Sequence, residues 1–127
     1  MDRHVRSRLQ KEKVIWLVTA DRAAKPQAVP VWFHWDGESF LIFSVDGAKA
    51  RHVRANPNVE LHLNSDEVGD DLVRVSGHAT ILRSRPAARA RAYLRKYRSD
   101  IRDLGASVDD FERRYHNPIQ VTRLRYH

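Results

Sequence analysis

The stretch from Gln27 to Pro57, two strands that lead to a basic helix start, holds the residues of this chain that best suit a chemical task, the binding of a flat, anionic molecule. Lys49 and Arg51 stand near the start of a short helix that the pattern predicts over residues 48–55. Free backbone N–H groups at a helix start and cationic side chains both favour an anion. The segment therefore predicts an anion-binding site, and the simpler alternative is a basic helix face in solvent.

Signatures of other chemistries are missing from the chain. It has no cysteine, which excludes disulfides and thiolate metal sites and indicates an intracellular compartment. It has no GxGxxG, GxxxxGK[ST] or GxSxG motif, and its seven histidines never adopt HExxH or another compact ligand spacing. The acidic cluster over residues 65–71 reads as a solvated turn. We expect no catalytic side chain and no metal site, so the protein either is not an enzyme or leaves the chemistry to a cofactor.

The bulk composition predicts one globular domain over residues 1–127. Hydrophobic residues make up 42% of the chain, which is ordinary for a folded protein. Lys and Arg number 23 and Asp and Glu 16, and this net charge of +7 favours nucleic acid, anionic lipid or a phosphorylated small molecule as a partner. The chain has no signal-peptide core and no apolar run near the ~18 residues of a membrane helix, so we expect a cytoplasmic protein without a membrane span.

The elements that must position Lys49 and Arg51 are predicted to be mainly strands. Residues 1–12 form a polar N-terminal helix or arm, and further helices follow Pro86 and open at Ser107, where a capping box is indicated. The Asp36-Gly37 pair predicts a tight hairpin. The apolar pattern predicts six strands, over residues 14–19, 27–35, 39–45, 59–64, 72–82 and 119–126.

Two residues inside these strands predict departures from a regular sheet. Pro30 cannot donate to a ladder, so its strand has a free edge, a bulge or a bend there. Gly77 indicates a bulge or a barrel corner. Six strands with local antiparallel connections favour a closed or split barrel, because closure removes exposed edges. The expected fold class is therefore mainly β (α+β), with short peripheral helices.

Four segments in this order resemble the pyridoxamine-phosphate-oxidase-like flavin and deazaflavin reductases: VIWLVTAD, KPQAVPVWFHWDGESFLIFS, AKARHVRANPNVELHL and VRVSGHATI. The likeness extends from about residue 10 to the C-terminus. The VPVWFxWDG hairpin and the following K-x-R-x-x-R-x-N-P look like the actinobacterial branch that uses the deazaflavin coenzyme F420. The resemblance implies a six-stranded antiparallel split β-barrel of the FMN-binding type, and a homodimer whose cofactor groove lies between the subunits.

The resemblance also implies residue roles. The strand around Pro30 and Trp32 would line the ring system of the cofactor, and the segment around Lys49 would hold its phosphate. His78 and the C-terminal Tyr126-His127 would reach the site from the partner subunit, although the family often has a Trp where this chain ends in Tyr126-His127. The expected cofactor-binding residues are Val29, Pro30, Val31, Trp32, Ser44, Lys49, Ala50, Arg51 and His78.

The function that the resemblance implies is a reductase that transfers a hydride from reduced coenzyme F420 to an electron-poor small molecule. One alternative keeps the fold but makes FMN the cofactor. Another is a non-catalytic module that binds a cofactor or, through the basic N-terminus, nucleic acid. Nucleic acid ranks last, because most aromatic residues fall on strand faces that are predicted to be buried and not available for base stacking.

Overall fold

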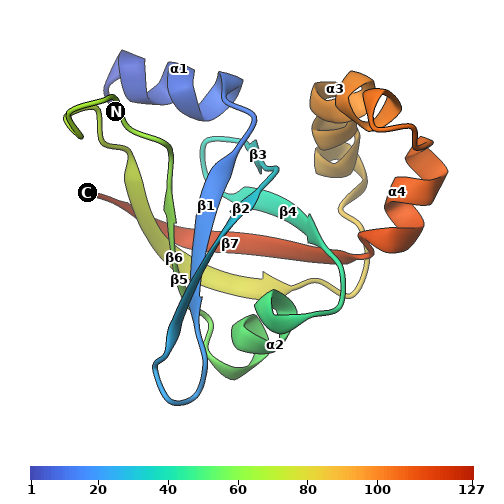
Figure 1. Cartoon of the computed structure of the whole chain (residues 1–127), viewed down its shortest axis with the longest axis horizontal. Coiled ribbons are helices and arrows are strands. Elements are labelled where there is room, and N and C mark those ends of the chain that lie inside the picture. Colours follow the sequence, from blue (N-terminus) through green and yellow to red (C-terminus); the bar gives the residue numbers. More distant parts are fainter.

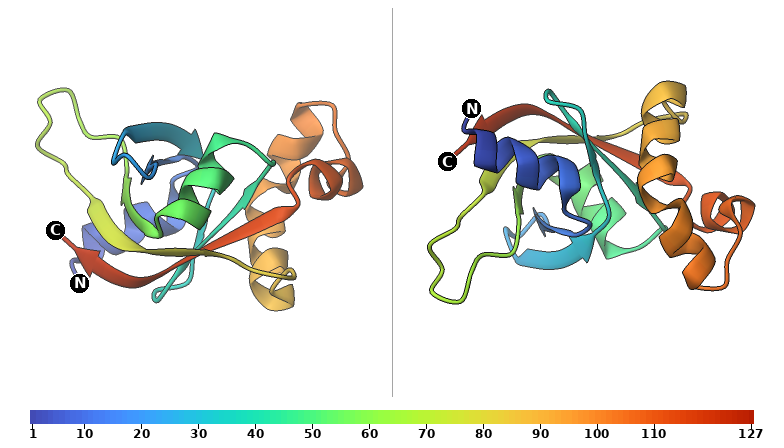
Figure 2. Two further views of the ribbon diagram at one scale, coloured as in Figure 1. Left: turned by 90° about the horizontal axis from the view of Figure 1, so that it is seen from below. Right: turned by 90° about the horizontal axis from the view of Figure 1, so that it is seen from above.

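A single seven-stranded antiparallel sheet, curled into a half-barrel, forms the centre of the molecule (Figures 1 and 2). The computed structural model describes residues 1–127. The order of strands across the sheet is β2-β1-β5-β6-β7-β4-β3. The elements in chain order are α1 (Arg3–Lys11), β1 (Ile15–Ala20), β2 (Pro26–Val31), β3 (His34–Trp35), β4 (Phe40–Ser44), α2 (Ala48–Ala55), β5 (Asn58–His62), β6 (Arg74–Ile81), α3 (Ala87–Asp103), α4 (Val108–Arg114) and β7 (Asn117–Tyr126).

This arrangement confirms the split barrel of the α+β class. In Figure 1, α1 and α2 lie near opposite ends of the barrel, and α3 and α4 lie together at one side. None of the four helices is both long enough and apolar enough to cross a membrane.

The structure has seven strands where six were predicted, because the expected strand over residues 27–35 is broken at Trp32 and Phe33. The N–H of Phe33 donates to the hydroxyl of Tyr97 at 2.9 Å, and the Nζ of Lys96 donates to the carbonyl of Phe33 at 2.9 Å. Both partners belong to α3. The helix therefore satisfies the backbone groups that a continuous strand would have given to its neighbour, and the chain separates into β2 and β3.

Two apolar clusters share the sheet. The alternation predicted for residues 29–35 is present, since Val31, Phe33 and Trp35 are buried inside the barrel. The second cluster lies between the sheet and the helices α3 and α4; it comprises Leu41, Phe43, Ala90, Tyr93, Tyr97, Ile101 and Phe111, with Trp32 packed against it. The strand β4 contributes to both clusters and is buried throughout, which fixes α3 and α4 against the outer side of the barrel.

The turn and breaker residues behave as their chemistry predicts. Pro30 lies on β2, which is an edge strand and pairs only with β1. Gly77 lies at a register shift between β6 and β7, where a Cβ atom would be only 2.6 Å from Cγ1 of Val121. Gly37 has a φ of +96° in the predicted hairpin, and Ser107 opens α4 with a complete capping box.

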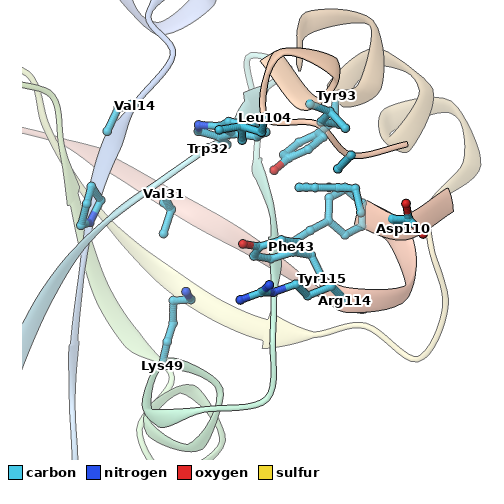
Figure 3. A pocket seen from close by; sticks show the side chains of 14 residues that line it. Val14, Val31, Trp32, Phe43, Lys49, Tyr93, Leu104, Asp110, Arg114 and Tyr115 are labelled. Atoms are coloured by element: carbon cyan, nitrogen blue, oxygen red, sulfur yellow. The ribbon is translucent and has the colours of Figure 1, made fainter. Parts of the chain in front are cut away.

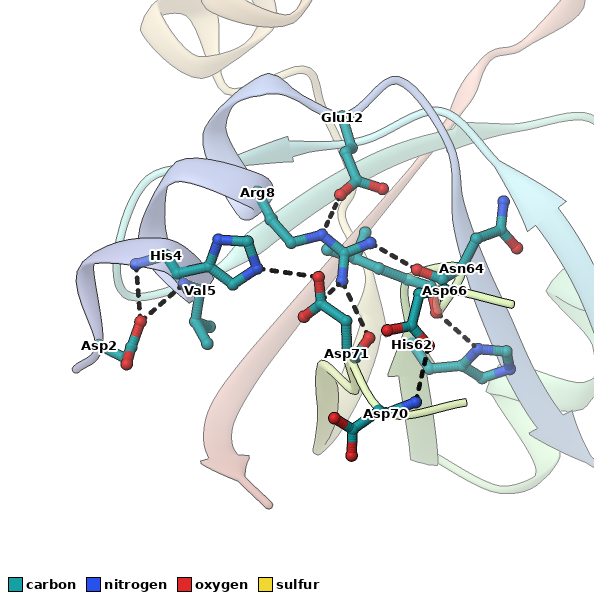
Figure 4. A network of polar contacts seen from close by, with 11 residues as sticks. Asp2, His4, Val5, Arg8, Glu12, His62, Asn64, Asp66, Asp70 and Asp71 are labelled. Atoms are coloured by element: carbon teal, nitrogen blue, oxygen red, sulfur yellow. Dashed lines mark hydrogen bonds and ion pairs between the residues drawn. The ribbon is translucent and has the colours of Figure 1, made fainter. Parts of the chain in front are cut away.

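The predicted N-terminal helix or arm is the helix α1, and it is fastened to the acidic loop (Figure 4). Arg8 pairs with Glu12 and, at 3.2 Å, with Asp71, and His4 Nε2 lies 2.8 Å from Asp71. The hydrogen bond from His4 and the charge of Arg8 hold the pKa of Asp71 below its usual range. Part of the basic charge of α1 is therefore engaged within the chain.

Candidate functional site

A cavity of about 570 Å³ lies between β2, β4, the start of α2 and the α3–α4 pair (Figure 3). Its walls are mostly apolar and aromatic, and its charged lining residues are Lys49, Asp110 and Arg114. This volume falls within the range of small-molecule sites, which usually combine apolar walls with a few polar groups. No three His, Asp or Glu side chains come together as a metal site anywhere in the chain.

One wall of the cavity is a stack of aromatic rings centred on Trp32. The ring of Trp32 lies nearly parallel to that of Tyr97, with centroids 4.5 Å apart and an angle of 4° between the planes. Phe111 stacks on Trp32 at 5.9 Å, and Tyr115 stacks on Phe111 at 4.7 Å. Trp32 occupies the break between β2 and β3, so its side chain turns out of the barrel toward α3. The stack fixes the position of Trp32 and makes this side of the cavity aromatic.

Lys49 enters the cavity from the first turn of α2 (Figure 3). Its side chain is half-buried, and burial is the one influence that lowers the pKa of its ammonium group. None of the eight ion pairs of the chain includes Lys49. Taking a cation out of water without a counter-ion costs free energy, so this position suits an anionic ligand group.

The start of α2 adds hydrogen-bond donors at the same place. Its N-cap residue is Gly47, which has no side chain to accept a hydrogen bond from the first turn. Free N–H groups at a helix start favour an anion, as the ammonium of Lys49 does. The structure therefore places Lys49 and the start of α2 together at the cavity, and binding of an anion there stays a prediction.

The structure brings only part of the predicted site together. Pro30, Val31, Trp32 and Lys49 line the cavity. The other five predicted residues do not line the cavity. Val29 packs partly buried against the barrel core, Ala50 is buried and Arg51 is exposed. Ser44 is buried and its hydroxyl donates to the carbonyl of Val45 at 2.8 Å, and His78 lies half-buried at the bulge in β6.

The terminal residues are bonded within their own chain. The hydroxyl of Tyr126 accepts from Nε1 of Trp35 at 3.0 Å, and Nε2 of His127 lies 2.9 Å from the hydroxyl of Ser76. Neither terminal residue lines the cavity. A contact from these residues to the site of a partner subunit stays a prediction of the resemblance.

Sequence reasoning missed the wall that α3 and α4 supply. Leu104, at the C-terminal end of α3, lines the cavity and is 76% exposed. Tyr93 and Phe111 are buried core residues that also line the cavity, and Arg114 gives it a second cation. The sequence predicted both helices, but it carried no sign that a cavity would form between them and the sheet.

An antiparallel half-barrel with helices packed on its outer side is the architecture of the split-barrel class. The model of the pyridoxamine 5'-phosphate oxidase family matches residues 1–127. The chain belongs to this family. No curated protein matches the sequence.

Solved structures with the same fold differ in what they bind. An F420 reductase is 19% identical, with a TM-score of 0.71 over 100% of this chain and 96% of that one. A putative pyridoxamine 5'-phosphate oxidase from Listeria innocua is 19% identical, with a TM-score of 0.70 over 97% and 94% of the two chains. HutZ, the heme storage protein from Vibrio cholerae, is 17% identical, with a TM-score of 0.66 over 94% and 87%. At these identities the likeness establishes the fold, and the cofactor must be argued from the cavity.

Proposed function

We propose that this protein is an oxidoreductase that binds coenzyme F420 in the cavity and reduces an electron-poor small molecule. The observation that carries the proposal is the half-buried Lys49, which has no counter-ion and faces an aromatic wall. Lys49 and the start of α2 would hold the phosphate of the cofactor, and Pro30, Val31 and Trp32 would pack against its rings. When bound, the reduced deazaflavin supplies the hydride, so no catalytic side chain is required.

The residues of this chain contribute binding, orientation and exclusion of water. Lys49 fixes one end of the ligand through its charge. Trp32 is held by its stack on Tyr97 and Phe111, so a planar ring that packs beside it finds a surface that is already in place. The apolar lining keeps water away from the reacting atoms, which protects a hydride donor from side reactions.

FMN is the second candidate cofactor, because it also carries a phosphate and a planar ring system. Heme receives less support from the cavity, although HutZ is described as a heme storage protein. Heme iron is most often held by His, Cys, Met or Tyr. No histidine lines the cavity, and Tyr93 and Tyr115 are its only lining residues of these types.

We also propose that the protein is a cytoplasmic homodimer whose second copy completes the groove. The support is β2, an edge strand whose Pro26, Ala28 and Pro30 side chains are exposed. An exposed edge is usually covered or blunted in a stable protein. Light scattering of the purified protein checks the stoichiometry, and a monomer at micromolar concentration would contradict the dimer.

Titration of the purified protein with F420, FMN and hemin, followed by fluorescence quenching, tests the cofactor. We expect F420 to bind with a Kd below about 100 μM, or roughly −5.5 kcal/mol, and more tightly than FMN. Tighter FMN binding would favour the flavin alternative. Failure of both F420 and FMN to bind in this range would reject the oxidoreductase proposal.

Substitutions in α2 locate the phosphate. Lys49→Ala should weaken cofactor binding by about tenfold or more, the expected loss for a charge-assisted hydrogen bond. Arg54→Ala is the matched control, because Arg54 is exposed on the same helix and does not line the cavity. Arg51→Ala measures what the other predicted cation contributes. Equal binding by Lys49→Ala and the wild-type protein would show that the phosphate lies elsewhere.

A further inference from the structure

The end of α4 places a second cation at the cavity. Arg114 lines the cavity, and Figure 3 shows its guanidinium directed into it beside Tyr115. The central carbon of the guanidinium lies 5.8 Å from the centroid of the Tyr115 ring. No ion pair of the chain includes Arg114, whereas the preceding residue, Arg113, pairs with Asp110.

The one carboxylate that lines the cavity is already engaged. Asp110 accepts from the backbone N–H of Ser107 in the capping box and from the side chain of Arg113. The hydrogen bonds with Ser107 and Arg113 hold the pKa of the Asp110 carboxyl below its usual range, so this carboxylate is charged and already paired. Arg114 is exposed and its charge has no partner within the chain, so an anion that enters the cavity can pair with it.

Arg114 and Lys49 reach the same cavity from different helices. They come from α4 and α2, and both side chains are directed into the cavity (Figure 3). The aromatic stack of Trp32 and Phe111 leads to Tyr115, which adjoins Arg114. A ligand held at Arg114 would thus have aromatic side chains next to its anionic group.

We propose that Arg114 binds the carboxylate of a planar, conjugated substrate, with the Tyr115 hydroxyl available as a second donor. The planar fork of a guanidinium matches the two oxygens of a carboxylate, and an aromatic ring attached to that carboxylate packs on Phe111 and Tyr115. The substrate class is then an electron-poor aromatic carboxylate. This assignment rests on the proposed function in one respect, because it leaves the Lys49 end of the cavity to the cofactor.

The test compares 4-nitrobenzoate with its neutral methyl ester, which keeps the ring and the nitro group. Calorimetry on the protein without cofactor should give the acid a Kd about tenfold lower than that of the ester, the scale of a charge-assisted hydrogen bond. Arg114→Gln should remove this preference, and Arg114→Lys should restore part of it. Arg102→Gln is the matched control, because it removes the same charge from an exposed position on α3 outside the cavity lining; it should keep the preference.

The same variants are measured with cofactor bound. Arg114→Gln should raise KM for 4-nitrobenzoate and leave the Kd of the cofactor unchanged. Equal binding of acid and ester by the wild-type protein, or equal losses in Arg114→Gln and Arg102→Gln, would overturn the carboxylate site. If no cofactor binds but the acid binds in an Arg114-dependent manner, the proposed function fails and the carboxylate site stands.

Discussion

Replacement of Lys49 by Met should raise the stability of the free protein and lower its affinity for an anionic cofactor. The ammonium of Lys49 is half-buried with no counter-ion, and burial lowers its pKa. Met has a similar length and is apolar, so it fills the same space without the cost of desolvating a charge. Higher stability together with weaker cofactor binding is expected only if Lys49 serves to bind a ligand and does not stabilise the fold.

The magnitude follows from the partial burial of the side chain. Full burial of one methylene contributes about 0.8 kcal/mol, so relief of a half-buried charge by an apolar group should raise the free energy of unfolding by about 0.5–1 kcal/mol. For a domain of this size we expect the Tm to rise by roughly 2–5 °C. The cofactor should bind about tenfold to a hundredfold more weakly, because hydrogen bonds to a charged group contribute about 1.5–3 kcal/mol.

The increase in the free energy of unfolding caused by Lys49→Met should depend on pH, and the pKa shift of Lys49 sets the direction. The pKa of Lys49 is lower in the folded protein than in the unfolded chain, so between the two values the unfolded chain binds more protons. Wild-type stability therefore rises with pH through that window. The advantage of Lys49→Met should be largest below the folded-state pKa and should shrink as the pH passes the ordinary lysine value of about 10.4.

Thermal and urea unfolding at pH 7 and pH 10, with and without F420, measure these effects. Arg54→Met is the control, because it removes a charge from an exposed position of α2 and should change the free energy of unfolding by less than about 0.5 kcal/mol. A Lys49→Met protein that is less stable than wild type without ligand would refute the reasoning, since Lys49 would then make a favourable contact within the chain. Unchanged cofactor affinity would refute the claim that Lys49 binds the cofactor.

Two further predictions concern the contacts of α3 with the strand break. Tyr97→Phe removes the acceptor for the buried N–H of Phe33 and should lower the free energy of unfolding in urea by about 1–3 kcal/mol. The control Tyr115→Phe should change the free energy of unfolding by less than about 0.5 kcal/mol. Equal losses in the two variants would contradict the role of the Tyr97 hydroxyl. Burial, assisted by the charge of Lys13, lowers the pKa of Lys96 to about 8, so wild-type stability relative to Lys96→Met should rise between pH 8 and pH 10.5. A pH-independent difference between these two proteins would show that Lys96 does not titrate in this range.

Most of the elements follow from local sequence. The helix over residues 48–55 has its predicted bounds, Ser107 opens α4 with the predicted capping box, and Gly77 lies at the predicted bulge. Each of these features depends on residues a few positions apart, which set backbone preference, end hydrogen bonds and the side to which apolar groups point. The same local chemistry singled out Lys49 as a cation at a helix start.

The tertiary structure decided which of these residues share a cavity. Sequence periodicity assigned Phe33 to a continuous strand, and only Tyr97, 64 positions along the chain, takes its N–H out of the ladder. Trp32 turns outward at that break and meets α3 and α4. The periodicity of apolar residues predicts that a helix has an apolar face. It does not predict which surface that face covers, because the packing of a helix is set by contacts between segments far apart in the sequence. For that reason the sequence singled out Lys49, whereas the position of Arg114 at the same cavity depends on how α4 packs against the barrel.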